Sequence, residues 1–487
     1  MRRRSELALL VGLLLAGLTG CAVGPDFQAP RAALPARWGH ADTVAIADAD
    51  ETPDVAWWKA FNDPVLNGLL ARVARANLDV QAAAARLMQA RAALGVADAG
   101  RLPGVNADAS YRHARSSAHG LADVSNRAGE ADYDLWQGGA DAAWEIDLWG
   151  RVRRQSEMAG AAVEASAELQ RDVLLAALAA TAQDYVSLRG VQAEREIVAR
   201  NLAIARHSQA LTQRRYDDGV ATGVDVAEAA AQVSTIEARL PALDNRADRQ
   251  INALSRLLAL PPAALAGELR AAAPIPAPPA LARVGLPAEL ARRRPDIRAA
   301  EARLHEATAG IGVAVADFYP RITLSGDFGL QALQLNELGD WGARIFGIGP
   351  VLRVPLFDGG RLRGQLALSQ ARQQEAMIDY QRTVLRAWHE VDDALGDYGA
   401  LRRQREKLAE AVARNETTLA QARRQYLAGA VDFLDVLALQ KDLLATQQDL
   451  ARNDAGIDLA LVRLFKALGG GWEADLPVAA ANLHGDS

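Results

Sequence analysis

The chain has little of several features that mark common classes of protein. A single cysteine among 487 residues excludes an internal disulfide framework and any multi-cysteine metal site. Aromatic residues make up only 5% of the chain, and no apolar run reaches the ~18 residues of a membrane-spanning helix. The net charge of −6 gives no basic surface of the kind that nucleic acid requires. These absences exclude a helical membrane transporter and a nucleic-acid-binding protein.

Residues that carry catalysis are also scarce. The seven histidines form no HExxH pair, and no two have metal-ligand spacing on an expected helix. The sequence has no Walker motif, and Gly469-Gly470-Gly471 follows an expected helix, where it is typical of a C-cap rather than of a phosphate loop. We therefore expect no enzymatic activity, no metal site and no cofactor apart from a covalent lipid.

The lipid is expected on the one cysteine. Arg2 to Arg4 and the short apolar segment Leu7 to Leu18 form a secretory signal, and Leu18-Thr19-Gly20-Cys21 resembles a bacterial lipoprotein cleavage site. Cleavage would remove residues 1–20 and leave Cys21 as the lipid-modified first residue. Ala22 is not the aspartate that retains such lipoproteins in the inner membrane, so the resemblance implies the outer membrane. An ordinary signal peptide with a chance cysteine is the alternative.

The chain contains an internal duplication. Residues 79–87 align with 296–304 at a shift of 217, and Tyr216-Asp217-Asp218-Gly219 aligns with Tyr426-Leu427-Ala428-Gly429 at a shift of 210. Between the copies, residues 261–287 are rich in proline. We therefore expect two tandem copies of one structural unit, joined by a proline-rich crossover.

Long helices dominate each copy. Residues 151–216 and 361–426 contain no proline and are rich in good helix formers, with coiled-coil spacings of apolar residues. Helices of this length would extend on the order of 100 Å. Gly219 and Gly429 are expected to end them, and second helices are expected to return towards Leu260, with a probable kink at Pro241, and towards Leu468.

Between the helices the sequence alternates with a period of two. Apolar residues occupy every second position of residues 105–111, 142–148, 322–330 and 346–354, apart from Gly326 and Pro350. Residues 105–149 and 318–357 also hold 11 of the 25 aromatic residues. This pattern is typical of membrane strands with apolar side chains towards lipid, although the core of a small water-soluble sandwich is an alternative.

Two hairpins supply only four strands, whereas membrane barrels have about eight or more. An open sheet edge in lipid would leave backbone groups without hydrogen bonds. If the strands lie in a membrane, several chains must therefore close one barrel together.

The chain resembles the outer-membrane factors of tripartite efflux pumps, the group of TolC- and OprM-like channels and NodT-type lipoproteins. The most specific segments are Cys21-Ala22-Val23-Gly24-Pro25-Asp26-Phe27, Trp144 to Arg151 (WEIDLWGR), Arg294-Pro295-Asp296-Ile297, Asp317-Phe318-Tyr319-Pro320 and Pro355 to Gly360 (PLFDGG). The resemblance implies a mainly α chain with a membrane β-barrel part, and a homotrimer with a 12-stranded β-barrel on a 12-helix α-barrel. Its implied role is a passive exit duct in the outer membrane that conducts small molecules.

The resemblance also implies an organisation and partners. The partners are a periplasmic adaptor, an inner-membrane RND-type pump and outer-membrane lipid. The expected segments are the signal peptide 1–20, the anchor, equatorial part and first helix 21–103, the first β-hairpin 104–149, the first helical hairpin 150–260, the crossover 261–287, the repeat helix 288–319, the second β-hairpin 320–357, the second helical hairpin 358–468 and the tail 469–487.

By the same resemblance, the helical turns carry an iris-like periplasmic gate. Tyr426 and Asp225 match residues that hydrogen-bond across coiled coils, Asp435 matches an acidic residue facing the pore, and Leu434 matches a constricting apolar residue. Two positions depart from the family: Ala438 stands where a second pore aspartate is common, and Val431 stands where an arginine can occur. Asp432 is a possible substitute for the missing charge.

Other interpretations remain open from the sequence. Asp225 and Asp435 could simply favour the N-termini of the returning helices, where free amides and the helix dipole suit an acid. A duct for type I protein secretion is an alternative within the family, and a non-conducting periplasmic coiled-coil lipoprotein scaffold is an alternative outside it. The sequence does not define the transported substrate.

Overall fold

The computed structural model describes residues 22–30, 38–40, 56–115, 117, 132–278 and 293–472. Its residues form two compact units. The sheet unit comprises Met1–Pro30, Leu87–Ser166 and Ala300–Tyr380, and the helical unit comprises Arg31–Arg86, Ala167–Ala299 and Gln381–Ser487. The signal peptide and Cys21 lie outside the described residues. No helix in the described ranges is both long and apolar enough to cross a membrane.

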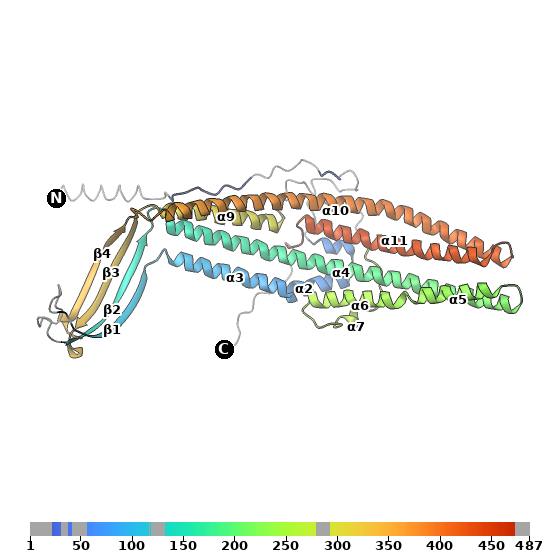
Figure 1. Cartoon of the computed structure of the whole chain (residues 1–487), viewed down its shortest axis with the longest axis horizontal. Helices are drawn as coiled ribbons and strands as arrows, with labels where there is room; N and C mark the ends of the chain where they lie inside the picture. Colours follow the sequence, from blue (N-terminus) through green and yellow to red (C-terminus); the bar gives the residue numbers. More distant parts are fainter. Residues whose placement is uncertain are drawn as a thin grey trace. The chain divides into compact units, whose positions relative to one another are not determined.

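The sheet unit contains one antiparallel sheet with strands in the order β1-β2-β3-β4. The strands are β1 (Gly104–Arg115), β2 (Asp132–Ile146), β3 (Arg321–Ala332) and β4 (Arg344–Arg353), and two short 3-10 helices, η4 (Leu335–Glu337) and η5 (Trp341–Ala343), precede β4. The two expected hairpins are thus joined edge to edge, because β2 pairs with β3 (Figure 1). Strands β1 and β4 are the free edges.

The register of the sheet sorts side chains into alternating rows. Ala107, Ala140, Phe328 and Phe346 lie opposite one another across the four strands. The adjacent row contains Asn106, Asp141, Asp327 and Gly347. Side chains of successive residues in a strand point to opposite faces, so one face of the sheet is apolar and the other is polar. None of the described residues covers the apolar face, because Phe346 is 81% and Phe328 is 59% exposed.

Long helices make up most of the remaining chain. They are α2 (Pro64–Ala76), α3 (Leu78–Ala99), α4 (Arg151–Asp217), α5 (Gly223–Glu237), α6 (Leu240–Leu257), α9 (Pro295–Ala316), α10 (Arg361–Leu427) and α11 (Phe433–Ala467), with the short helices η2 (Trp57–Phe61) and α7 (Ala266–Leu269). Helices α4 and α10 have 67 residues each, which confirms the two long helices expected from the duplication. In the first copy, Asn77 divides the expected first helix into α2 and α3.

The returning helices differ between the two copies. Helix α11 runs uninterrupted for 35 residues, whereas its counterpart is divided into α5 and α6 between Glu237 and Leu240. Pro241 occupies the first turn of α6, where its missing N–H costs no helical hydrogen bond. The interruption expected at this proline is therefore present, just before the proline itself.

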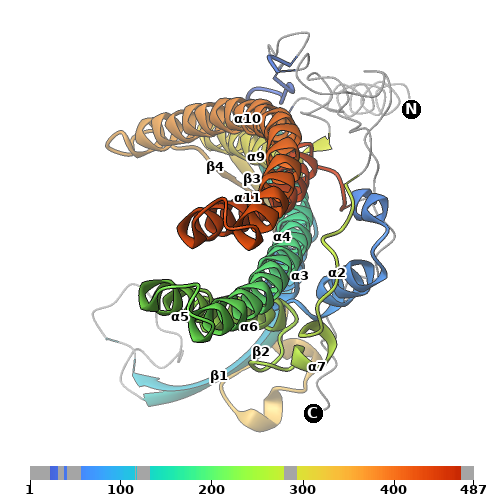
Figure 2. The ribbon, with the colours of Figure 1, turned by 90° about the vertical axis from the view of Figure 1, so that its right-hand side faces the viewer.

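Two apolar clusters hold the helices of the helical unit together. One joins α4, α5, α6 and α11 around Val198, Ile236 and Leu444. The other joins α5, α10 and α11 around Leu419, Tyr426, Phe433 and Val436. Within this unit, α10 lies beside α11, and α5 and α6 lie beside α4 (Figure 2). The packing places the turn between α4 and α5 and the turn between α10 and α11 in the same unit.

Candidate gate at the turns of the long helices

The first turn links α4 to α5 and has strong local signals. Gly219 has a φ of +72°, a conformation that residues with a Cβ disfavour, and the N–H of Val220 donates to the carbonyl of Arg215. Thr222 then caps α5. Its Oγ1 accepts from the N–H of Asp225 at 3.2 Å, and the Asp225 carboxylate accepts from the N–H of Thr222 at 2.8 Å. This reciprocal capping box fixes the start of α5.

The second turn links α10 to α11 and is less tightly capped. Gly429 has a φ of +75°, and the N–H of Ala430 donates to the carbonyl of Gln425. Asp432 occupies the N-cap of α11, but its side chain accepts no capping hydrogen bond. Asp435 lies in the first turn of α11, where the helix dipole stabilises a carboxylate. Asp432 and Asp435 both remain exposed.

Tyr426 connects the two turns through Arg215. The Tyr426 ring is buried, packs against Phe433 with the ring centroids 5.5 Å apart, and lies 4.5 Å from the Arg215 guanidinium carbon. Arg215 Nη1 also donates to the Tyr426 carbonyl at 3.3 Å. The end of α4 is thereby tied to the end of α10 by a cation–π contact and a hydrogen bond.

The structure brings together only some of the residues named from the sequence. Tyr426, Leu434, Asp435 and Asp432 all belong to the second turn, whereas Asp225 belongs to the first. Among the described residues, the side-chain hydrogen bonds of Asp225 go to Thr222 and not to Tyr426. The helix-capping interpretation of Asp225 is therefore confirmed within one chain. A role for Asp225 between chains stays a prediction.

Leu434, the expected constricting residue, is exposed in this chain. It is 54% exposed at the start of α11, while its neighbours Phe433 and Val436 are buried. Ala438 lies one helical turn after Leu434 and is also exposed. The structure leaves the pore-facing roles of Leu434 and Asp435 as predictions. Arg215 was missed from the sequence, although a cation in the last turn of α4 was a usable signal.

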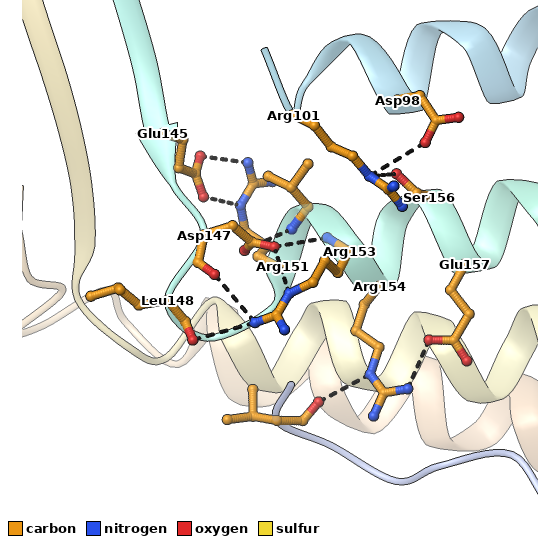
Figure 3. A network of polar contacts seen from close by, with 12 residues as sticks. Asp98, Arg101, Glu145, Asp147, Leu148, Arg151, Arg153, Arg154, Ser156 and Glu157 are labelled. Carbon is orange, nitrogen blue, oxygen red and sulfur yellow. Dashed lines mark hydrogen bonds and ion pairs between the residues drawn. The ribbon is translucent and has the colours of Figure 1, made fainter. Parts of the chain in front are cut away.

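A second polar network lies at the junction of β2 and α4 in the sheet unit (Figure 3). Arg151 forms a bidentate pair with Glu145 at 2.6 and 2.8 Å, and the Asp147 carboxylate accepts from the N–H groups of Val152 and Arg153. Glu145 and Asp147 come from the WEIDLWGR segment. This segment therefore turns the chain from strand to helix and caps α4.

The residues that follow Cys21 are bound to the same junction. The N–H of Val23 donates to the carbonyl of Trp149 at 3.0 Å, and Arg154 pairs with Asp26 at 2.6 Å. At Gly24, with a φ of +91°, a Cβ would lie 2.5 Å from the Cα of Gly312, so only glycine fits. Two segments that lie more than 120 residues apart in the sequence thus form one site.

The Arg294-Pro295-Asp296 segment is a structural centre of the helical unit. Arg294 is buried, pairs with Asp296 and Glu390 at 2.8 and 2.7 Å, and donates to the carbonyl of Ala467 at 2.9 Å. Burial opposes ionisation of Asp296, but the hydrogen bonds from Arg294 outweigh it and lower the pKa of Asp296. Gly469, with a φ of +74°, ends α11 against Arg294, which confirms the C-cap expected there.

One acidic side chain of the helical unit has no such support. Asp458 of α11 is fully buried, and neither carboxylate oxygen has a hydrogen-bond partner among the described residues. Burial, together with the nearby Asp454 carboxylate, raises the pKa of Asp458 to about 8. It borders a cavity of about 370 Å³ that is also lined by Tyr398, Arg402 and Pro276.

Comparison with known proteins agrees with this architecture. The family model described as "Outer membrane efflux protein" matches residues 69–260 and 286–470. The chain therefore belongs to the outer membrane efflux protein family, and it is a protein of the outer membrane. The expected resemblance to outer-membrane factors is confirmed.

Individual relatives match over nearly their full length. The toluene efflux pump outer membrane protein TtgF of Pseudomonas putida is 31% identical over 478 residues, which cover 96% of this chain and 98% of the relative. Outer membrane protein OprJ of Pseudomonas aeruginosa is 33% identical over 469 residues, which cover 96% and 95%. The solved outer-membrane channel OprN is 32% identical and superposes with a TM-score of 0.88, covering 93% of this chain and all of OprN.

These matches decide two expectations. The predicted fold class is confirmed, because a mainly helical chain with a four-stranded antiparallel sheet matches solved outer-membrane channels. The family is one of efflux proteins rather than enzymes, in line with the scarcity of catalytic motifs.

Proposed function

We propose that this chain is the passive exit duct of a tripartite efflux system. Three copies would close a 12-stranded β-barrel on a 12-helix α-barrel, and the duct would conduct small molecules from an inner-membrane RND-type pump and a periplasmic adaptor to the exterior. An iris-like gate at the turns of the long helices would close its periplasmic end. A lipid on Cys21 would anchor it to the outer membrane.

The alternating rows of the sheet carry this proposal. An uncovered face with Phe328 and Phe346 suits lipid, and the opposite face with Asn106, Asp141 and Asp327 suits a water-filled lumen. The soluble sandwich is disfavoured, since no second layer within the described residues covers the aromatic row. Exposed aromatic side chains on this scale would be unfavourable in water.

The free edges of the sheet support closure by several copies. Strands β1 and β4 have 12 and 10 residues, and among the described residues each has a partner on one side only. Pairing β4 of one copy with β1 of the next would satisfy the backbone of both edges in lipid. Three copies bring the four strands per chain to twelve, an even number within the range of bacterial membrane barrels.

The names of relatives support small molecules as the transported class. Similar proteins are described as outer membrane proteins of toluene and solvent efflux pumps and of pyoverdine export. All of these are small organic compounds rather than proteins. We therefore favour efflux of small molecules over type I protein secretion.

The gate is tested by removing its proposed hydrogen bond between copies. Tyr426→Phe combined with Asp225→Ala keeps the Tyr426 ring against Arg215 but removes the hydroxyl and the carboxylate. We expect a higher single-channel conductance in planar bilayers, because fewer bonds hold the turns closed. A single variant, Thr222→Ala, weakens the same helix cap but keeps the Tyr426 hydroxyl and the Asp225 carboxylate in place, so it serves as the control for loss of the cap alone. Parental conductance of the double variant would show that the gate assignment is wrong.

The assembly is tested in cells and in detergent. The duct predicts a heat-modifiable, detergent-resistant trimer in outer-membrane fractions, and it predicts that Cys21→Ser protein stays in that membrane through its barrel. A coiled-coil scaffold instead predicts that Cys21→Ser releases a soluble monomer. Crosslinking in cells, followed by identification of the co-purified inner-membrane protein, separates an efflux pump from a protein secretion system.

A further inference from the structure

A cavity of about 420 Å³ lies between the two helical hairpins of the helical unit, close to Tyr426. Its walls are mostly apolar: Ile204 and Leu211 come from α4, and Phe433 and Val436 come from α11. Cavities of this size and character commonly hold small organic ligands. The cavity is bounded by helices from both copies of the duplicated unit.

One charged side chain, Arg423 of α10, lines this cavity. Its Nη2 atom is buried and has no hydrogen-bond partner among the described residues. Burial lowers the pKa of the Arg423 guanidinium. No acidic residue lines the cavity, so the half-buried Arg423 guanidinium has no counter-ion there, which costs free energy.

Neighbouring arginines are compensated in ways that Arg423 is not. Arg206 pairs with Glu237 at 2.9 Å, Arg215 stacks on Tyr426, and the exposed Arg424 donates to the carbonyl of Ala420. Arg423 is the one of these four arginines that lines the apolar cavity. The Arg423 guanidinium and the apolar walls together suit a ligand that has an anionic group and an apolar body.

We propose that this cavity binds an amphipathic organic anion, with Arg423 holding the carboxylate and the apolar walls enclosing the rest of the molecule. A guanidinium binds a carboxylate through two parallel hydrogen bonds, which would satisfy the buried Nη2 atom. His207 and Ser208 of α4 also line the cavity and offer further polar contacts. The site lies in the wall between helices, so the proposal does not depend on whether the chain conducts.

An occupant would act on the relative stability of the helices around it. The cavity is lined by α4, α10 and α11, so a bound molecule contacts all three. A ligand that binds only the folded arrangement stabilises it in proportion to the logarithm of its concentration over Kd. Binding should therefore raise the thermal unfolding midpoint of the protein.

The test uses 1-naphthoate, a fluorescent aromatic carboxylate, with the full chain in lipid nanodiscs. Fluorescence anisotropy gives Kd, and thermal unfolding with and without 1-naphthoate gives the stabilisation. Arg423→Gln removes the charge, and the matched control Arg424→Gln removes the adjacent exposed charge. Ala203→Phe fills the cavity from α4 and leaves Arg423 in place, so it tests the site if Arg423→Gln fails to fold. The amine 1-naphthylmethylammonium tests the requirement for negative charge.

We expect saturable binding that weakens at least tenfold in Arg423→Gln and in Ala203→Phe and stays unchanged in Arg424→Gln. The amine should not compete. Equal affinity in all variants, or equal binding of the amine, would overturn the proposal. A change of oligomeric state in Arg423→Gln would also overturn it, because Arg423 would then pair with another copy of the chain.

Discussion

At the scale of single residues, Asp458 stands out because its environment favours the neutral acid. The carboxyl is fully buried without a hydrogen-bond partner among the described residues, and its pKa is raised from 3.8 to about 8. In the unfolded chain the same group ionises near its ordinary value. The folded protein therefore holds one more proton than the unfolded protein between about pH 4 and pH 8.

This proton difference predicts a falling stability as the pH rises. The contribution of Asp458 to the free energy of unfolding should be highest below about pH 4, fall through the window up to about pH 8, and then level off. A shift of this size corresponds to an upper limit of about 6 kcal/mol. Asp458→Asn keeps the shape without the charge, so its stability relative to the parent should increase over the same window. Thermal unfolding midpoints from pH 4 to pH 9 measure this difference.

The control is Asp442→Asn, which changes an exposed acid on the same helix. It should follow the parental pH profile. If Asp458→Asn also followed it, the Asp458 carboxyl would be solvated in the assembled protein, and the buried proton would be excluded.

At the scale of elements, glycines in left-handed conformations decide where the long helices end. Gly219 and Gly429 occupy equivalent places after α4 and α10, with φ values of +72° and +75°. Each allows a turn that is only a few residues long before the next helix begins. The length of the helices is therefore set by backbone conformation at two residues as much as by apolar packing.

Two substitutions of glycine by alanine should change the stability of the protein in opposite directions. Gly429→Ala places a Cβ in a left-handed conformation and should destabilise the turn by roughly 1 kcal/mol, although nothing lies within 4 Å of that Cβ. Gly456→Ala lies inside α11, where alanine is the better helix former by roughly 1 kcal/mol and its Cβ would meet Leu401 at an ordinary 3.5 Å. Thermal unfolding of the two variants checks both signs. A stabilised Gly429→Ala protein would show that the turn relaxes into another conformation.

At the scale of the whole molecule, the four-stranded sheet would form one third of the proposed barrel. Among the described residues, nothing covers its apolar row, and its outer strands are paired on one side only. In the proposed assembly, the strands therefore depend on lipid and on neighbouring copies for their stability. Substitutions on the two faces of the sheet should affect this assembly very differently.

A matched pair of lysine substitutions tests the two faces. Phe346→Lys puts a charge on the proposed lipid face, which should cost about 2–4 kcal/mol per chain near the membrane midplane and reduce the detergent-resistant trimer. Asp327→Lys changes the adjacent row on the proposed lumen face and should leave the trimer intact. Semi-native gels of outer-membrane fractions measure the trimer. A reversed order would mean that the faces are assigned the wrong way round.

The sequence predicted the elements much better than the contacts between them. Proline-free stretches, glycine punctuation and period-two alternation are local signals, so α4 and α10 were placed to within one residue at Asp217 and Leu427. The tie between Arg215 and Tyr426 and the pair of Arg154 with Asp26 join residues more than 120 positions apart. The periodicity of a sequence does not predict such pairs, because they depend on how separate helices and strands pack against one another.

Only part of the candidate site could be predicted from the sequence. The duplication pointed to both turns, and the capping role of Asp225 followed from its place at a helix start. The buried atoms of Asp458 and Arg423 that have no hydrogen-bond partner among the described residues could not be predicted, since a helical pattern does not show which polar residue lacks a partner. Burial without a hydrogen bond becomes visible only in three dimensions.

The first described residues of the chain pack closely against the start of α4, which bears on the position of the protein in the bilayer. Ala22 lies so near Gly150 that a Cβ there would approach the Ala22 Cβ to 2.6 Å, and Asp26 is held by Arg154. Cys21, the proposed site of the lipid, directly precedes Ala22 in the sequence. Acyl chains on Cys21 would therefore set how deeply the strands insert relative to the surface of the leaflet. Residues inserted just after Ala22 would separate the lipid from the packed segment, and the lipid would then no longer set the insertion depth of the strands.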